Sequence, residues 1–407
     1  MKKGFFSFSQ MNGEYPELSE TIRCGTPTAV FGISDAHKYL IAAMVEAPVV
    51  YVTSDATATR KAAENIASLS GKRVEILSAK DEVLLYRKAL SKDAYYRRLN
   101  GIHALQSGAE IVVAEIDALI QLFPKRLPTI DFVEGEEIDF LSLPERLVKM
   151  GYARVSEVET KGSFALRGDI LDLYPINCEN PARIDFFGDT VEHIKPYDIV
   201  TGNRLHIVKS LSVLSATDVF LEEDEEASLA AILRKGLNGF SSVEAYDRAN
   251  AIATELIDGL ETGNGNGYLL PLMKNSTDVF GVLPEGCVFI FDEGKPLFDK
   301  LNAVYKEHEE RFLRLSEGGE AFPFAKEQPA DTAEPSVLQG TLYLRLPSEE
   351  GTLFPKIKAI LNMFPGHSTA IVYFADTKVR RGTQCALDSR MLKEVKAVLG
   401  EENVVVK

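Results

Sequence analysis

A glycine and a lysine near the start of the chain stand at the spacing of a phosphate-binding loop. Gly32 and Lys38 are six positions apart, as are the first glycine and the lysine of the pattern GxxxxGKS/T. Farther along, the apolar run Val288–Phe291 ends in Asp292 and Glu293. An ATPase uses such a pair to hold the magnesium shell and to orient the attacking water. These four polar and glycine positions would together supply the chemistry of ATP hydrolysis.

The residues that surround the lysine do not suit that chemistry. A phosphate loop needs small residues, so that backbone N–H groups reach the phosphates, and a Ser or Thr after the lysine to hold magnesium. Asp35 adds a negative charge, His37 adds bulk, and Tyr39 stands where the small hydroxyl is required. We therefore interpret the four positions as a degenerate nucleotide site with no catalytic residues. The carboxylate pair also suits a helix cap, and an ATPase built on Lys38 stays as the competing enzyme hypothesis.

A second set of residues has the composition of a protein-binding surface. In a strand beginning at Arg183, Ile184 and Phe186 share one face, while Arg183, Asp185 and Phe187 share the other. If the sheet packs on one side only, an arginine and an aromatic ring are presented together to solvent. That pair is typical of an interface anchor. The alternative is an ordinary sheet in which Arg183 pairs with Asp185 or covers apolar surface.

The strand belongs to a compact antiparallel β unit predicted over Gly151 to Asp198. Phe164 and Leu166 alternate with Arg167, which places the arginine on the outward face of its own strand. Ile170 to Tyr174 supplies the next apolar run, and turn residues separate these strands from the one described above. We therefore expect one sheet to position both arginines and the exposed phenylalanine.

The runs GSFALRGDILDLYP and PARIDFFGDTVEHIKPYD carry a family resemblance. They look like the UvrA-binding domain shared by the excision-repair protein UvrB and by bacterial transcription-repair coupling factors, and they are closer to the coupling factors. In that family, two arginines and a phenylalanine of this sheet contact UvrA, and the matching positions are Arg167, Arg183 and Phe187. The resemblance also implies that the nucleotide loop has decayed, because UvrB keeps a working loop whereas the coupling-factor module has lost it.

Around this unit, strand and helix patterns alternate as in an α/β domain with a parallel sheet. Four apolar runs are expected to be strands, namely Thr28–Phe31, Val49–Thr53, Val74–Leu77 and Ile111–Ala114. Ahead of the last run, a helical stretch contains Arg98, Leu99 and Leu105, and it resembles the matching segment of the coupling factors.

The predicted fold class is therefore α/β, with several domains. A degenerate P-loop, UvrB-like domain is expected from residues 1–140 and 216–328, with the UvrA-binding β domain at 141–215 inserted into it, as the resemblance implies. Residues 329–340 are expected to be a linker, because the stretch from Glu317 to Gly340 is rich in Pro, Gly, Ala and Glu and has little aliphatic content. A small α+β domain is expected at 341–407.

The element order expected at 341–407 is βαββαβ, which we interpret as a ferredoxin-like domain. This stretch resembles the C-terminal tail of the bacterial DNA polymerase III α subunit, and the resemblance implies replisome proteins as possible partners. Lys378, Arg380 and Arg381 form a basic turn, for which a solvated turn is the simpler interpretation.

Composition limits the remaining possibilities. A net charge of −15 and a pI near 5.1 argue against a surface that follows a phosphate backbone throughout, although one basic patch stays possible. The four cysteines and six histidines are scattered, so we expect no metal site, no cofactor and a reducing, cytoplasmic location. No run is long and apolar enough for a membrane span.

The leading hypothesis is a non-catalytic module that binds UvrA to recruit nucleotide-excision repair. The translocase lobes and the RNA-polymerase-binding domain of a complete coupling factor are not recognised in the chain, so contacts with RNA polymerase or DNA are expected only through such missing domains. Two alternatives stay open: a UvrB-like ATPase, and a replication accessory that acts through residues 341–407.

Overall fold

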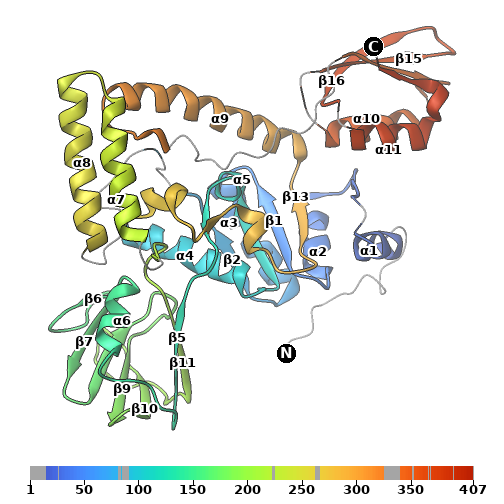
Figure 1. Ribbon diagram of the computed structural model, residues 1–407. Helices are drawn as coiled ribbons and strands as arrows, with labels where there is room; N and C mark the ends of the chain where they lie inside the picture. Colours follow the sequence, from blue (N-terminus) through green and yellow to red (C-terminus); the bar gives the residue numbers. More distant parts are fainter. Residues whose placement is uncertain are drawn as a thin grey trace.

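The computed structural model shows an α/β body, a β insertion, a helical arm and a smaller C-terminal unit (Figure 1). The structure describes residues 15–25, 27–80, 84, 91–221, 225–261, 266–324, 340–350, 353–364, 366, 368–387 and 389–406. The mixed α/β class expected from the sequence is confirmed. The expected linker at 329–340 lies almost wholly outside the described residues.

The body is built on a parallel sheet with the strand order β13-β1-β3-β2. Its strands are β1 (Val49–Thr53), β2 (Val74–Leu77), β3 (Ile111–Glu115) and β13 (Val288–Phe291). Helices α2 (Asp35–Met44) and α3 (Ala56–Ser70) share a core with Val49 and Tyr51 of β1. Helix α4 (Lys92–Gln106) shares a core with Val50 and Val52, which point to the opposite face. Because helices cover both faces, β1 is apolar at every position but its last.

Local sequence signals fix the ends of α3. The Asp55 carboxylate accepts hydrogen bonds from the backbone N–H groups of Thr57 and Ala58, both at 2.9 Å. These bonds, with that of Ala58 the stronger, lower the pKa of Asp55. At the other end Gly71 adopts a left-handed conformation with φ of 64°, which glycine tolerates without a Cβ penalty. Asp55 is therefore the N-cap of α3.

The strand predicted at Thr28–Phe31 is wrong. Residues 27–31 have no regular secondary structure, and Val30 and Phe31 are exposed. Thr, Val and Phe favour strands locally, but a strand also needs a neighbour with which to pair, and this segment pairs with none of the described strands. As a result Gly32 does not follow a strand of the sheet, which is where a P-loop begins.

A helical arm extends from the body and has its own core. Helices α7 (Glu225–Gly236) and α8 (Val243–Glu261) pack as a pair, and α9 (Gly294–Glu317) runs from β13 to this pair (Figure 1). Phe312 and Leu315 near the end of α9 lie in the arm's core. The described part of the segment that returns from the insertion to the body is therefore mostly helical.

The β insertion is a five-stranded sheet with the order β10-β9-β8-β7-β6. Its strands are β6 (Ala153–Arg154), β7 (Ser163–Arg167), β8 (Ile170–Tyr174), β9 (Ala182–Phe187) and β10 (Thr190–Pro196). The chain enters along β5 (Thr129–Val133), followed by α6 (Leu143–Lys149), and leaves along β11 (Ser210–Leu214). β5 and β11 pair antiparallel along their whole length. The predicted antiparallel unit is present as β7 to β10, and β6 adds to its edge in parallel. The two-stranded ribbon joins this sheet to the body.

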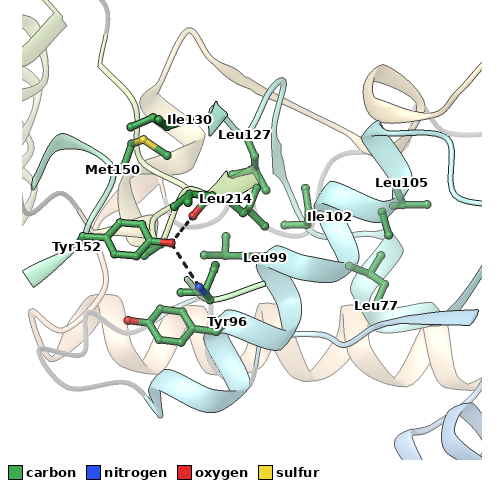
Figure 2. Close-up of a cluster of buried hydrophobic side chains, with 14 of the residues drawn as sticks. Leu77, Tyr96, Leu99, Ile102, Leu105, Leu127, Ile130, Met150, Tyr152 and Leu214 are labelled. Atoms are coloured by element: carbon green, nitrogen blue, oxygen red, sulfur yellow. Dashed lines mark hydrogen bonds between the residues drawn. The ribbon is translucent and has the colours of Figure 1, made fainter. Parts of the chain in front are cut away.

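Helix α4 joins the insertion to the body. Figure 2 shows Tyr152 with hydrogen bonds on both sides of its hydroxyl, which donates to the Leu214 carbonyl at 2.7 Å and accepts from the Ile176 N–H at 3.3 Å. Asn100 of α4 donates to the Ile176 carbonyl at 3.1 Å. Leu99 of α4 belongs to the same buried cluster as Leu214. The insertion therefore packs on the body through both apolar contacts and hydrogen bonds.

The residues Arg98, Leu99 and Leu105, noted for their resemblance to the coupling-factor helix, are buried. The Arg98 guanidinium donates to the Ser78 carbonyl at 2.9 Å and lies over the Phe123 ring. Arg98 therefore connects α4 to the segments after β2 and before β5. We assign these residues to the core.

The C-terminal unit has the predicted order βαββαβ. Its elements are β14 (Leu342–Leu346), α10 (Leu353–Met363), β15 (Ser368–Phe374), β16 (Arg380–Cys385), α11 (Ser389–Leu399) and β17 (Val404–Val406). The strand order is β16-β15-β14-β17. β14 and β15 are direct parallel neighbours, so the first βαβ unit is not split by another strand as in a ferredoxin-like sheet. The element order is confirmed, and the ferredoxin-like pairing is wrong.

Candidate functional site

Strand β9 presents two of the three predicted partner-binding residues on one face. Ala182, Ile184 and Phe186 are buried, and the residues between them point outward. Among these, Arg183 is part-exposed and Phe187 is 76% exposed. An exposed phenylalanine on the same face as an arginine has the composition of an interface anchor. The alternation read from the sequence is confirmed.

Arg183 is held by a carboxylate of the neighbouring strand. Its Nε donates to Asp172 Oδ1 at 2.7 Å and its Nη2 donates to Asp172 Oδ2 at 2.8 Å. These hydrogen bonds raise the pKa of Arg183 above its ordinary value. The alternative pairing with Asp185 is wrong, because Asp185 pairs with Lys195 of β10. Asp172 of β8 lies directly opposite Arg183 of β9 in the register of the two strands, and this is why Arg183 pairs with Asp172.

Arg167 lies at the end of β7 and shares a groove with Arg183. The groove has a volume of about 250 Å³. Its charged lining consists of Arg167, Arg183, Lys195, Arg204, Glu157 and Asp172. Arg167 donates from Nη2 to the Ser156 carbonyl, which orients it along the rim. Asp185 lies outside the lining but pairs with Lys195, so four cations face three carboxylates in all, and the groove keeps a net positive charge that suits an acidic segment of a partner.

Phe187 forms an apolar end to this outer face. It is the last residue of β9 and stands directly before the turn at Gly188, whose φ is 61°. Ile170, at the start of β8, is 38% exposed and lies opposite Asp185 in the register. The face therefore has an apolar end beside a charged groove, the combination of anchor and polar rim found in protein interfaces.

Sequence reasoning missed several residues of this face. They are Ile170, Asp172, Tyr197 and Arg204. The period-two pattern of Ile170 to Tyr174 could have found the first two, because it places them on the same side as Arg183 once the strands pair. Burial raises the pKa of the Tyr197 hydroxyl, which keeps this groove residue a neutral donor. Its pairing with Arg204 across a bend has no signal in the sequence.

The structure brings three of the four predicted nucleotide-site residues together. Lys38 of α2 donates to Asp292 Oδ1 at 2.8 Å, and its Nζ lies 3.9 Å from Glu293 Oε1. Behind them, burial and the charge of Asp292 raise the pKa of the Tyr51 hydroxyl, which is fully covered. Gly32 lies in the bend before α2 with φ of 73°. The lysine thus has a carboxylate partner inside the protein, and a phosphate would have to displace it.

Among the residues that the structure describes, no group of three or more His, Cys, Asp or Glu side chains could hold a metal ion. None of the described helices has both the length and the apolar content needed to cross a membrane.

The β insertion is the part of the chain that matches a known family model. Residues 130–219 match the family model of the UvrB interaction domain, a range that includes all of β11 and all of β5 except its first residue, Thr129. Similarity to curated proteins extends farther. The transcription-repair-coupling factor of Bacillus subtilis is 24% identical over 325 residues, which cover 76% of this chain and 27% of that protein.

Two further relatives agree with this result. The transcription-repair-coupling factor of Myxococcus xanthus is 28% identical over 228 residues, covering 52% of this chain and 19% of that protein. UvrABC system protein B of Thermotoga maritima is 27% identical over 215 residues, covering 48% of this chain and 32% of that protein. The chain spans about a third or less of these relatives. It is similar to the UvrB-like N-terminal module of transcription-repair-coupling factors, and its β insertion is the part that matches the UvrB interaction domain.

Proposed function

We propose that this chain is a non-catalytic docking module that binds UvrA through its β insertion and so recruits nucleotide-excision repair. One observation carries the proposal: Arg183 and Phe187 face solvent from the same strand, beside the groove that contains Arg167, inside the region that matches the UvrB interaction domain. An arginine held in place and an exposed aromatic ring are the side chains that dominate binding energy in interfaces.

The groove and the exposed ring of Phe187 contribute to binding in different ways. Arg167 and Arg183 supply directional hydrogen bonds and long-range attraction to an acidic partner surface. Phe187 supplies apolar area that is already exposed in the free chain, so its burial has a large favourable free energy. Since Arg183 is fixed by Asp172, little side-chain entropy is lost when the partner binds.

Calorimetry with purified UvrA tests this proposal. The intact chain is expected to bind, and Arg183→Ala, Arg167→Ala or Phe187→Ala should each weaken binding by about 2 kcal/mol, roughly thirtyfold. Arg146→Ala on α6 and Phe280→Ala on the body are matched controls, because both side chains are exposed and lie outside the groove. Absence of binding by the folded chain would reject the proposal.

We also propose that the nucleotide site is inactive. The support is the ion pair between Lys38 and Asp292, which neutralises the one lysine at the phosphate-loop spacing. A titration with magnesium and ATP should give no heat at about millimolar ligand, a concentration at which working nucleotide sites are saturated. Saturable binding that is lost in Lys38→Met would instead favour the ATPase hypothesis. The expected cytoplasmic location and replisome contacts stay predictions.

A further inference from the structure

The sheet of the C-terminal unit has one covered face and one open face. Helices α10 and α11 both lie on the same side of it (Figure 1). The strand residues on that side share a buried core with the two helices, and they include Leu344 of β14, Val372 of β15 and Cys385 of β16. Since side chains alternate along a strand, the residues between them point to the opposite side.

The open face carries two tyrosines on its two central strands. Tyr343 of β14 lies opposite Ile371 of β15, and Arg345 of β14 lies opposite Tyr373 of β15. The two tyrosines are therefore diagonal neighbours on the same face of the sheet. Tyr343 is 39% exposed. Tyr373 is part-exposed.

Two arginines flank these rings. Arg345 follows Tyr343 on the same face of β14, and Arg380 of β16 lies directly opposite Tyr373. Both arginines are exposed, and neither has a hydrogen bond or an ion pair through its side chain with another described residue. Arg381, on the opposite face of β16, instead pairs with Glu349 at 2.8 Å. The cations on the open face are thus not neutralised within the described part of the chain.

The charge of the unit differs from that of the remaining chain. Residues 341–407 contain ten Lys and Arg against seven Asp and Glu, whereas residues 1–340 contain 35 against 53. A basic unit in a chain of net charge −15 is a localised electrostatic feature and would attract a polyanion to this unit in preference to the body.

We propose that the open face of the C-terminal sheet binds single-stranded nucleic acid. Bases would stack on Tyr343 and Tyr373, and Arg345 and Arg380 would contact the phosphates. Aromatic rings on the central strands of an open four-stranded sheet are a recurring platform for unstacked bases, and stacking is tolerant of sequence. A duplex offers its bases only at groove edges, so this face selects single strands. The proposal concerns a different surface from the UvrA-binding insertion and does not depend on it.

Fluorescence anisotropy with the full chain tests the inference. The probes are labelled oligothymidine and oligouridine of about 20 nucleotides, with the same length of duplex DNA as comparator. The single strands are expected to bind at about 50 mM salt, and a fourfold increase in salt should weaken binding about sevenfold if two phosphates are contacted. Comparing the DNA and RNA probes then identifies which backbone is preferred.

Matched variants separate stacking from general charge. Tyr343→Leu and Tyr373→Leu keep apolar volume but remove the aromatic face, and each should weaken binding about tenfold. Arg345→Gln should lower the salt slope by about 0.7. Tyr246→Leu on α8 and Lys356→Gln on α10 are controls with exposed side chains away from the open face, and circular dichroism verifies folding.

The outcomes are distinct. Binding that falls in the tyrosine variants and not in the controls supports the inference. If the folded chain binds neither single strand, or if Lys356→Gln weakens binding as much as the tyrosine variants do, the inference is overturned, and the open face would then be a surface for a protein partner. UvrA binding is expected to be the same in every one of these variants.

Discussion

Asp172 holds Arg183 along a single edge of its guanidinium, through the Nε and Nη2 atoms at 2.7 and 2.8 Å. A guanidinium has five N–H donors in a rigid fork, so the edge formed by Nη1 and the second hydrogen of Nη2 stays available. The side chain of Asp172 is only 9% exposed, and the partner therefore meets an oriented arginine and not a bare carboxylate. Asp172 is a positioning residue for the partner-binding face.

Replacing Asp172 should weaken UvrA binding without removing a direct contact. In Asp172→Asn the charged partner of Arg183 is lost, the arginine regains rotamer freedom, and affinity should fall about five- to tenfold. The loss should nearly vanish when Arg183→Ala is already present, which a double-mutant cycle by calorimetry measures. Glu145→Gln, which breaks an exposed ion pair with Lys149 on α6, is the control. Additive losses would contradict the positioning role.

The ion pair between Lys38 and Asp292 should contribute to stability. The two side chains are 18% and 12% exposed, so Asp292→Asn removes the carboxylate 2.8 Å from a largely covered ammonium, and Glu293 lies farther away, at 3.9 Å. We expect a loss of about 1–3 kcal/mol in the free energy of unfolding, measured by urea denaturation. Lys306→Met, in an exposed pair with Glu310, should change stability by less than about 0.5 kcal/mol. Equal effects of both variants would refute the prediction.

A buried carboxylate at the return from the insertion should make stability depend on acid pH. Burial acts to raise the pKa of Asp218, but Lys80 at 2.9 Å, the Tyr95 hydroxyl at 2.6 Å and the nearby Arg98 outweigh it, so that the pKa is lowered. Its stabilising effect is therefore complete above the unfolded value near 3.9 and is lost as the pH falls through the lower folded pKa.

The Asp218→Asn variant tests this dependence. It should lose about 3 kcal/mol at neutral pH, because Lys80 is left without its charged partner, and its stability should vary less than that of the wild type below about pH 4. Urea denaturation at a series of pH values gives both quantities. Asp299→Asn, in an exposed pair with Lys295, should follow the wild-type curve. If the stability of Asp218→Asn falls below about pH 4 as steeply as that of the wild type, other carboxylates control the acid dependence of stability.

Two glycines of the insertion should respond differently to alanine. Gly162 and Gly168 have φ values of 75° and 59°, so both pay a similar backbone penalty of about 1 kcal/mol. A Cβ at Gly162 would also fall on the hydroxyl of Tyr96 in α4, whereas a Cβ at Gly168 would meet nothing within 4 Å. Gly162→Ala should therefore cost about 1–3 kcal/mol more than Gly168→Ala in thermal or urea denaturation. Equal costs would mean that α4 and the insertion move apart easily.

The sequence predicted those features that depend on local pattern. The alternation in β9 placed Arg183 and Phe187 outward because burial follows period two in a half-covered sheet. The partner of Arg183 was not predictable in the same way, because Asp172 and Asp185 are both plausible until the register of β8 against β9 is known. Side-chain pairs across strands depend on which residues lie opposite, and composition does not encode that information.

Pairing between elements also explains the two wrong predictions of fold. Thr28–Phe31 has strand composition but lacks a described partner strand, and composition alone cannot supply one. In the C-terminal unit the element order was predictable, whereas the direct contact of β14 with β15 was not. A βαβ crossover of this length can place its second strand next to the first strand, or leave room for another strand between them. Both arrangements bury similar apolar residues.

The ribbon of β5 and β11 has a consequence for how such modules spread between proteins. The two crossings run side by side over five paired positions, from Thr129 with Leu214 to Val133 with Ser210, so the chain leaves the host and returns about one strand spacing, roughly 4.8 Å, away. A recipient surface loop of that width can therefore accept both ends of residues 129–214 while its own sheet keeps its strand order. The side of the insertion that packs on α4 also needs an apolar surface to cover it. A graft into a loop beside such a surface should carry the partner-binding face with it, whereas a graft into a fully exposed loop should be less stable.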